Sequence, residues 1–508
     1  MPPGRDDTVL VRLVEGLEGQ VEIRTELVLR FEYGSAVPWL RRLDDGWLAV
    51  VGPNAVRIES AIELEGKDFT SVGSATVSAG ESLPFALTWF ASHCDPPEPI
   101  DAEQALEETE AFWQEWSARC TYDGEWAEPV RTSLRVLKGL IYEPTGGIVA
   151  APTASLPEWL GSERNWDYRY CWLRDATLTL VALIDSGYLE EAGAWREWLF
   201  RAAAGKPADL QIMYGVAGER RLAEYQADWL PGYEGSRPVR IGNAASEQMQ
   251  LDVYGEIIDA FTVARSHGLE ASDHAWRLSI NLLEFLEEAW RRPDSGIWEV
   301  RGPNRHFTHS KVMAWVAFDR AIRTCEEWER EGPVDLWRSI RSEIHADVCA
   351  NGFDPDLGSF VQSYGSKRLD ASLLLIPLVG FLPIKDDRIV GTIDLIGRTL
   401  AQNGLIMRYE ADEENMDVDG LPPGEGVFLP CSFWYAADLW QLGRHDEARA
   451  LFARLLDLRN DLGLISEEYD PEACRMLGNF PQAFTHLALV ACAYVLGGKE
   501  TPGGMPSR

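Results

Sequence analysis

From about residue 126 to residue 496, one pattern recurs: apolar residues at a helical period, separated by loops rich in Gly, Trp and polar residues. About twelve such segments follow one another without a strict sequence repeat, which disfavours a solenoid of near-identical units. Helices paired by long loops favour a closed toroid, because loops at one end of such a ring can converge on a pocket. An open α-solenoid is the alternative, with shorter connections. The predicted helices span residues 129–142, 175–186, 189–204, 248–267, 271–291, 310–331, 334–350, 371–380, 387–400, 430–443, 446–456 and 481–496.

Residues 8 to about 92 follow the period-two or β-rich patterns that are typical of strands. Such stretches begin at Thr8, Val21 and Trp47, and Gly or Asp-Gly breaks separate them. Pro84-Phe-Ala-Leu-Thr-Trp-Phe has the pattern of a closing strand. We therefore predict a multidomain protein, with an antiparallel β domain ahead of an all-α toroid.

Asp95-Pro-Pro-Glu-Pro is a rigid break between these two patterns, and residues 101–119 beyond it have a helical pattern. These features divide the chain into four predicted segments. They are a β domain at 1–98, a linker helix at 99–125, the toroid at 126–498 and a disordered tail at 499–508.

The formal net charge of −34 restricts the partners that we expect. Nucleic-acid binding needs a basic surface that neutralises phosphates, and anionic membranes repel acidic proteins, so neither partner is predicted. A neutral sugar brings no such electrostatic penalty. Twenty Trp, 15 Tyr and 18 Phe make a heavy aromatic load. Most of these rings will be core, but aromatic rings also cover the apolar faces of sugars.

Eight cysteines show no CxxC pair and no zinc-ligand spacing. We therefore expect reduced thiols, no metal site and a reducing compartment. The N-terminal segment lacks the apolar run of a signal peptide, and no stretch of about 18 apolar residues could span a membrane. These features predict a cytoplasmic location.

Three segments have the chemistry of a sugar site. Residues 164–175, Arg-Asn-Trp-Asp-Tyr-Arg-Tyr-Cys-Trp-Leu-Arg-Asp, place aromatic platforms beside charged groups that can grip hydroxyls. Further on, Gln248, Asp252 and Glu256 lie four residues apart, which puts them on one face of a predicted helix that can point into the toroid. The third segment, Ser466-Glu-Glu-Tyr-Asp, is a run of carboxylates on a loop. Taken singly, the three have structural explanations as a helix N-cap, a solvated helix face and a solvent-facing loop.

Together these segments resemble glycoside hydrolase family 15, the family of glucoamylases, glucodextranases and some bacterial trehalases. The resemblance spans roughly residues 8 to 496 and implies an N-terminal β-sandwich followed by an (α/α)6 barrel. It also implies a longer β segment with an Asp-Gly-Ser-Ile-Asp-Trp stretch, which this sequence lacks. We therefore expect the sandwich to be truncated or the start of the gene to be misassigned. Further similar runs are His309-Ser-Lys-Val-Met-Ala-Trp, Leu369-Asp-Ala-Ser, Leu405-Ile-Met-Arg-Tyr-Glu and Gly426-Val-Phe-Leu-Pro-Cys-Ser-Phe-Trp.

The resemblance implies substrate contacts residue by residue. Four residues match the walls and the hydroxyl grip of the terminal glucose subsite, and one arginine matches a further subsite. Two acidic residues beside the expected catalytic groups are also counted as substrate-binding. The set is Tyr168, Trp172, Arg174, Asp175, Arg408, Asp252 and Glu468.

The resemblance also implies the catalytic pair. Glu467 in Ser-Glu-Glu-Tyr-Asp matches the family's catalytic base. The fungal motif Asp-Leu-Trp-Glu-Glu resembles Asp252-Val-Tyr-Gly-Glu256, with Gly255 replacing one acidic position, and this implies Glu256 as the acid. Asp252 and Glu247 are the alternatives for the acid.

Such a pair would cleave glycosides with inversion, because a protonated carboxyl meets the leaving oxygen while a carboxylate activates water on the opposite face. The two groups would lie roughly 6.5–9.5 Å apart, and no metal or organic cofactor is needed. Release of glucose from the non-reducing end of α-glucosides, as by a glucoamylase, is the first hypothesis. Hydrolysis of trehalose is the alternative. The loops at about 206–240 and 409–426 shape the pocket beyond the first glucose and so decide between the two activities. A non-catalytic sugar-binding protein and an inverting phosphorylase are further hypotheses. The sequence also leaves open whether the chain forms a homo-oligomer.

Overall fold

The computed structural model describes residues 8–270, 272–410, 420 and 424–498. It divides into two compact units, Met1–Arg119 and Cys120–Arg508. The boundary between them falls inside the segment predicted as a linker helix. The predicted disordered tail at 499–508 and most of the loop at 409–426 lie outside the described residues.

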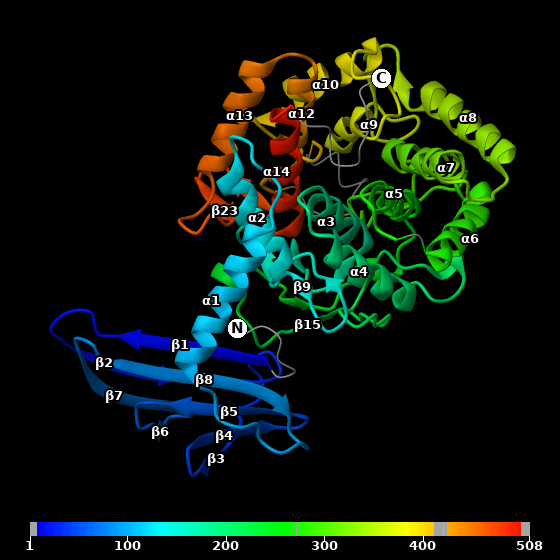
Figure 1. The fold of residues 1–508 in the computed structure, drawn as a ribbon. Coiled ribbons are helices and arrows are strands. Elements are labelled where there is room, and N and C mark those ends of the chain that lie inside the picture. The colour runs from blue at the N-terminus through cyan, green and yellow to red at the C-terminus, as the bar shows by residue number, and fades with distance from the viewer. Residues whose placement is uncertain (1–7, 271, 411–419, 421–423, 499–508) are drawn as a thin grey trace. The chain divides into compact units, whose positions relative to one another are not determined.

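The first unit consists of two antiparallel sheets and one helix (Figure 1). Leu27 from the smaller sheet packs against a core cluster of the larger one, around Ala49, Ile58 and Leu64. The prediction of an N-terminal antiparallel β region is therefore confirmed. The five-stranded sheet has the order β1 (Thr8–Glu15), β8 (Ser82–Ala91), β5 (Asn54–Ser60), β4 (Gly46–Val51) and β3 (Trp39–Leu43), and the three-stranded sheet has the order β2 (Gln20–Leu27), β7 (Thr70–Ser78) and β6 (Glu65–Lys67).

Helix α1 (Ala102–Ala118) closes the first unit and contacts β1 and β8. Asp101 is its N-cap, because the side chain of Asp101 accepts a hydrogen bond from the backbone N–H of Gln104 at 3.0 Å. The Pro-rich break ahead of Asp101 therefore leads into a helix that starts where the sequence predicts it.

The second unit is helical. Six inner elements contact one another in succession, α3 to α5, α7, α9, α12 and α14, and α14 returns to α3 (Figure 1). The inner helices are α3 (Leu173–Asp185), α5 (Asp252–Ser266), α7 (Thr308–Trp328), α9 (Leu375–Leu378) with the 3-10 turn η4 (Ala371–Leu374), α12 (Leu429–Gln441) and α14 (Ala483–Leu496). The helices packed around them are α2 (Ala127–Gly139), α4 (Leu189–Ala202), α6 (Asp273–Ala289), α8 (Val334–Asn351), α10 (Asp387–Thr399) and α13 (His445–Asp457).

The sequences of the helices explain which ones are inside. Helix α14 is apolar on nearly every face, and a helix of that kind is stable only when it is buried all round. Helix α10 buries Ile389, Thr392, Ile393 and Ile396, which form one stripe at helical spacing, as expected for an outer helix.

One helix begins later than its sequence pattern predicts. Gln248 lies before α5, which starts at Asp252, so Gln248 does not share a helix face with Asp252 and Glu256. The side chain of Asp294 accepts a hydrogen bond from Leu251 N at 3.0 Å, so a distant residue holds the backbone just before the helix. That contact cannot be seen in local periodicity.

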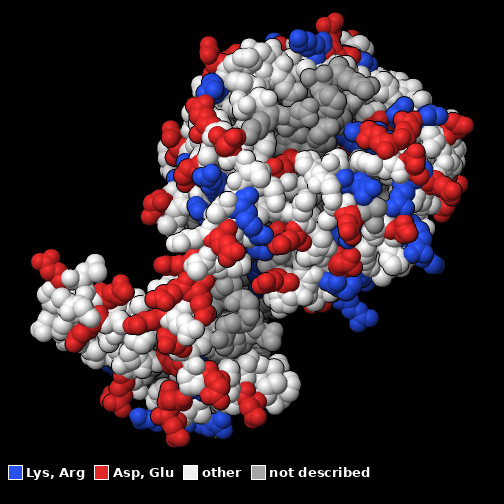
Figure 2. All heavy atoms as spheres, in the orientation of Figure 1, with Lys and Arg blue, Asp and Glu red and all other residues white. Residues whose placement is uncertain are grey.

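Among the described residues, no helix is long and apolar enough to cross a bilayer. On the face of the molecule drawn in Figure 2, acidic side chains are spread widely and basic ones lie between them. This distribution is consistent with the net charge of −34.

Candidate active site

A pocket of about 40 Å³ on the helical unit is lined by aromatic and charged side chains, and we call it the aromatic pocket. Trp172, at one wall, directly precedes α3, so the pocket lies where loops meet the beginning of an inner helix. Three of the predicted sugar-binding residues line it. The lining includes Glu158, Trp166, Tyr168, Trp172, Trp298, Glu299, Arg301 and Arg408.

Glu467 lies next to this pocket and is bonded to one of its walls. The hydroxyl of Tyr168 donates to Oε1 of Glu467 at 2.7 Å, and the N–H of Asn479 donates to Oε2 at 3.4 Å. Glu467 is 1% exposed, and burial raises its pKa to about 8. The nearby Glu158 carboxylate contributes to this rise in pKa, whereas Arg408 and the two donors act against it.

Arg174 and Asp175 begin α3 and form a buried ion pair, with 2.8 Å between Nη2 of Arg174 and Oδ2 of Asp175. The same guanidinium reaches Oε1 of Glu299 at 2.8 Å and the carbonyl of Ile297 at 2.5 Å. The predicted hydroxyl grip is therefore directly bonded to Glu299, an acidic residue of the pocket that the sequence analysis did not select.

Glu299 is presented by a loop in an uncommon backbone conformation. Its φ is 49°, in the left-handed region that non-glycine residues seldom occupy and that is often found at functional sites. Nε2 of Gln248 donates to the carbonyls of Glu299 and Val300 at 3.2 and 3.1 Å and so holds this loop. Burial raises the pKa of Glu299, and Arg174 opposes this effect.

Tyr168 is bonded to Glu467 and lines the same pocket as Glu299. Its phenol is bonded to Glu467, and the negative charges of Glu467, Glu158 and Glu299 all raise its pKa. Glu299 and Glu467 therefore both lie within electrostatic reach of one hydroxyl at the wall of the pocket.

The predicted acid, Glu256, does not line the aromatic pocket. It is 5% exposed and lines a second cavity inside the ring of helices, together with Thr177, His309 and Met313. Asp252, one turn earlier on α5, is 0% exposed and also lies outside the pocket lining. The structure thus places residues 252–256 at the buried beginning of an inner helix, outside the pocket lining, whereas Glu158 and Glu299 are the described carboxyl groups that line the pocket.

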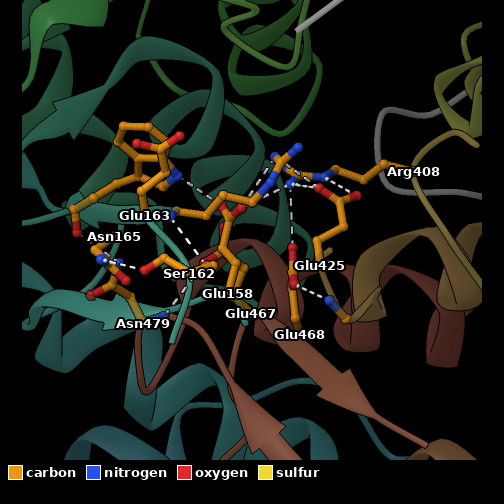
Figure 3. A network of polar contacts seen from close by, with 12 residues as sticks. Glu158, Ser162, Glu163, Asn165, Arg408, Glu425, Glu467, Glu468 and Asn479 are labelled. Carbon is orange, nitrogen blue, oxygen red and sulfur yellow. Dashed lines mark hydrogen bonds and ion pairs between the residues drawn. The ribbon is translucent and has the colours of Figure 1, made fainter. Parts of the chain in front are cut away.

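Arg408 is held by three carboxylates, as Figure 3 shows. Its Nη2 lies 2.6 Å from Glu425, 3.2 Å from Glu158 and 3.3 Å from Glu468. Arg164 adds a second guanidinium, 3.2 Å from Glu425. Glu468 is fully buried, and its other oxygen accepts a hydrogen bond from Gly426 N at 2.7 Å.

The same three glutamates are close enough together to share a cation. Arg408 contacts each of them, and Arg164 contacts Glu425 and Glu158. Two fixed guanidiniums thus supply the positive charge that these carboxylates need, so the cluster has the character of an ion-pair network.

Trp166 is clamped between two arginines at the rim of the pocket. The guanidinium carbons of Arg301 and Arg240 lie 4.4 and 4.6 Å from its ring centroid, and Glu224 pairs with both arginines. Its indole N–H donates to Glu158 at 3.0 Å. The ring is therefore fixed, as a preorganised binding platform requires.

Several pocket residues were missed from the sequence, and some had a signal. Trp298-Glu299 retains the Trp-Glu pair of the fungal motif Asp-Leu-Trp-Glu-Glu, which the segment ending at Glu256 lacks. Trp166 belongs to the aromatic run at 164–175 that was singled out as a whole. Glu158 follows a short strand and has no comparable signal.

Buried glutamates on loops around an aromatic pocket, in a unit built on a ring of helices, fit the chemistry of a glycoside hydrolase. The sequence model of the family described as Glycosyl hydrolases family 15 matches residues 128–494. The chain belongs to glycoside hydrolase family 15.

Relatives and solved structures extend the similarity over most of the chain. A trehalase of Thermoplasma acidophilum is 37% identical over 484 residues, which cover 95% of this chain and 82% of the relative. A trehalase of Mycobacterium tuberculosis is 38% identical over 507 residues, which cover 97% and 74%. A bacterial glucoamylase solved in complex with acarbose has a TM-score of 0.67 at 12% identity and covers 90% of this chain and 73% of its own, so it shows a shared fold.

Proposed function

We propose that this glycoside hydrolase is an α,α-trehalase that cleaves trehalose into two glucose molecules with inversion. Two relatives similar over nearly the whole chain are named trehalases. This favours trehalose over the glucoamylase-like activity that the sequence analysis placed first. The fold proposed for the helical unit is an (α/α)6 barrel, with α3, α5, α7, α9, α12 and α14 as its inner ring.

In the proposed mechanism Glu299 is the general acid and Glu467 the general base. The observation that carries this assignment is that Tyr168, which is bonded to Glu467, lines the same pocket as Glu299, which Arg174 holds. Glu299 protonates the glycosidic oxygen, and its raised pKa keeps the proton available. Glu467 removes a proton from the attacking water, and the hydroxyl of Tyr168 orients its carboxylate.

The remaining predicted residues receive roles around this pair. Tyr168 and Trp172 form walls for the glucose ring, and Arg174 with Asp175 holds the hydroxyls and the acid together. Arg408, which also lines the pocket, is assigned to the second sugar. Glu468 and Asp252 are assigned to holding the protein framework, because both are fully buried away from the pocket lining. The scheme uses no metal or organic cofactor.

The experiment is a glucose-release assay on trehalose, maltose, isomaltose and soluble starch, followed by NMR of the first anomers formed. Inversion converts one glucosyl unit of trehalose to β-glucose while the leaving unit stays α, so equal initial amounts of both anomers are expected. Only α-glucose at first would contradict inversion. Rapid turnover of maltose or starch without trehalose would return the function to the glucoamylase-like hypothesis.

A further inference from the structure

A second cavity lies inside the helical unit, and we call it the axial cavity. It measures about 140 Å³ and is lined by all six inner helices, α3, α5, α7, α9, α12 and α14. It shares no lining residue with the aromatic pocket. The two are nevertheless neighbours, because Ile297 lines the axial cavity and the next residue, Trp298, lines the aromatic pocket.

The walls of the axial cavity are largely apolar. Side chains such as Val181, Met313, Leu378, Phe433 and Leu487 supply most of the surface. Protein cavities of roughly 150 Å³ with apolar walls accept a molecule of benzene size. The axial cavity therefore has the size and the lining for a short alkyl chain.

One end of the cavity carries two polar atoms without partners. Oε2 of Glu256 and Nδ1 of His309 have no hydrogen-bond partner among the described residues. Both side chains line the cavity and are more than nine-tenths buried, at 5% and 3% exposed. A buried polar atom without a partner is costly, so a ligand that supplies a donor here gains a favourable contact.

The groups around this end favour a basic ligand. Burial raises the pKa of Glu256 well above its usual range, Asp252, Asp175 and Glu299 raise it as well, and Arg174 lowers it, so a bound amine can take the proton of this carboxyl. Arg320 and Asp259 are charged residues that also line the cavity. Arg320 is already paired with Asp259 at 2.5 Å and with Asp319 at 2.8 Å. The unpaired oxygen of Glu256 thus belongs to a carboxyl group that can pair with an amine, while the arginine is already neutralised.

We propose that the axial cavity is a binding site for a short primary alkylamine, distinct from the sugar site. Its ammonium group donates to Glu256 and His309, and its alkyl chain lies along the apolar walls. Because the ligand contacts Ile297, which helps to hold Arg174, binding is expected to change the turnover number without competing with the sugar.

Isothermal titration of the whole chain with n-butylamine and n-hexylamine at neutral pH tests this proposal directly. Each buried methylene strengthens binding about fourfold, so n-hexylamine should bind roughly fifteenfold more tightly than n-butylamine. An excess of glucose, which occupies the aromatic pocket, should leave the dissociation constant unchanged. Displacement of n-hexylamine by glucose, or no binding at all, would overturn the proposal.

Two variants and one matched control locate the site. Glu256→Gln should weaken n-hexylamine binding at least tenfold and leave n-hexanol binding unchanged. Ala491→Phe fills the cavity and should abolish binding of both ligands. Ala450→Phe makes the same change on the exposed side of α13 and should alter neither. Unchanged n-hexylamine affinity in Glu256→Gln and in a folded Ala491→Phe variant would show that amines bind elsewhere, for instance at the carboxylates of the aromatic pocket.

Discussion

The phenol hydroxyl of Tyr168 donates a 2.7 Å hydrogen bond to Oε1 of Glu467. The same phenol also lies in the electrostatic field of Glu299. Tyr168 and Glu299 line the same pocket, so two carboxyl groups that lie far apart in the sequence are brought to one site. This relationship is the basis for assigning Glu299 and Glu467 as the catalytic pair.

Tyr168→Phe should shift the pH dependence of kcat/KM. The base works only as a carboxylate, so activity is lost as the pH falls through the pKa of Glu467, which is about 8. The Tyr168 hydroxyl stabilises the ionised form and lowers this pKa, so its removal raises the pKa further. We expect the acidic limb of the profile to move up by about one pH unit. Tyr254→Phe, which removes a hydroxyl bonded to Pro207, is the control and should leave the limb in place.

Glu425→Ala should impair both stability and turnover. Glu425 is buried and holds Arg408 through contacts of 2.6 and 3.2 Å, so its removal leaves buried guanidiniums without a full complement of charge. Loss of one partner of a buried pair costs about 3–5 kcal/mol of unfolding free energy. Displacement of Arg408 should lower kcat/KM by roughly a hundredfold.

A matched ion pair at the surface separates the effect of burial on stability from the effect of ion pairing itself. Glu447 binds Arg444 in the same two-contact geometry, at 2.7 and 2.6 Å, but the two side chains are 57% and 34% exposed. Glu447→Ala should cost less than about 1 kcal/mol. Equal losses from the two changes in urea unfolding would contradict the claim that burial makes the Arg408 network important.

Asp438→Asn should stabilise the protein at alkaline pH. Asp438 on α12 is fully buried, neither carboxyl oxygen has a hydrogen-bond partner among the described residues, and burial raises its pKa well above the usual range. Above pH of about 3.9 the unfolded chain releases this proton while the folded chain retains it, so rising pH favours unfolding.

Urea unfolding from pH 4.5 to 8.5 measures this effect. The stability of the wild type should fall relative to Asp438→Asn as the pH rises, with a gap of about 1–3 kcal/mol at the alkaline end. The same change at the exposed Asp461 is the control. A constant gap between wild type and Asp438→Asn across the range would argue against a buried neutral carboxyl.

The helices were predictable to within a few residues where each one buries an apolar stripe, as in α8 and α10. The beginning of α5 was not, because the backbone at Leu251 is held by Asp294, a contact that tertiary folding creates. The β region was likewise predictable, because strands such as β2 alternate apolar and polar residues with a period of two.

The candidate site was predictable only where a motif was long. The run at 164–175 located Tyr168, Trp172 and Arg174, and the carboxylate run located Glu467. Glu299 has a left-handed φ on a loop that is hydrogen-bonded by Gln248, and no periodicity marks such a turn. Glu158 and Glu425 gain their roles only from the fold, which brings them to Arg408.

Hydrolysis of trehalose and of α-glucosyl fluoride by Glu299→Gln, Glu467→Gln and Glu256→Gln tests the assignment of the catalytic pair most directly. Fluoride leaves without protonation, so Glu299→Gln should lose trehalose turnover by about a hundredfold to ten-thousandfold and keep activity on the fluoride. Glu467→Gln should lose both activities, and Glu256→Gln should keep both. Loss of trehalose turnover in Glu256→Gln, with near-normal turnover in Glu299→Gln, would contradict the account.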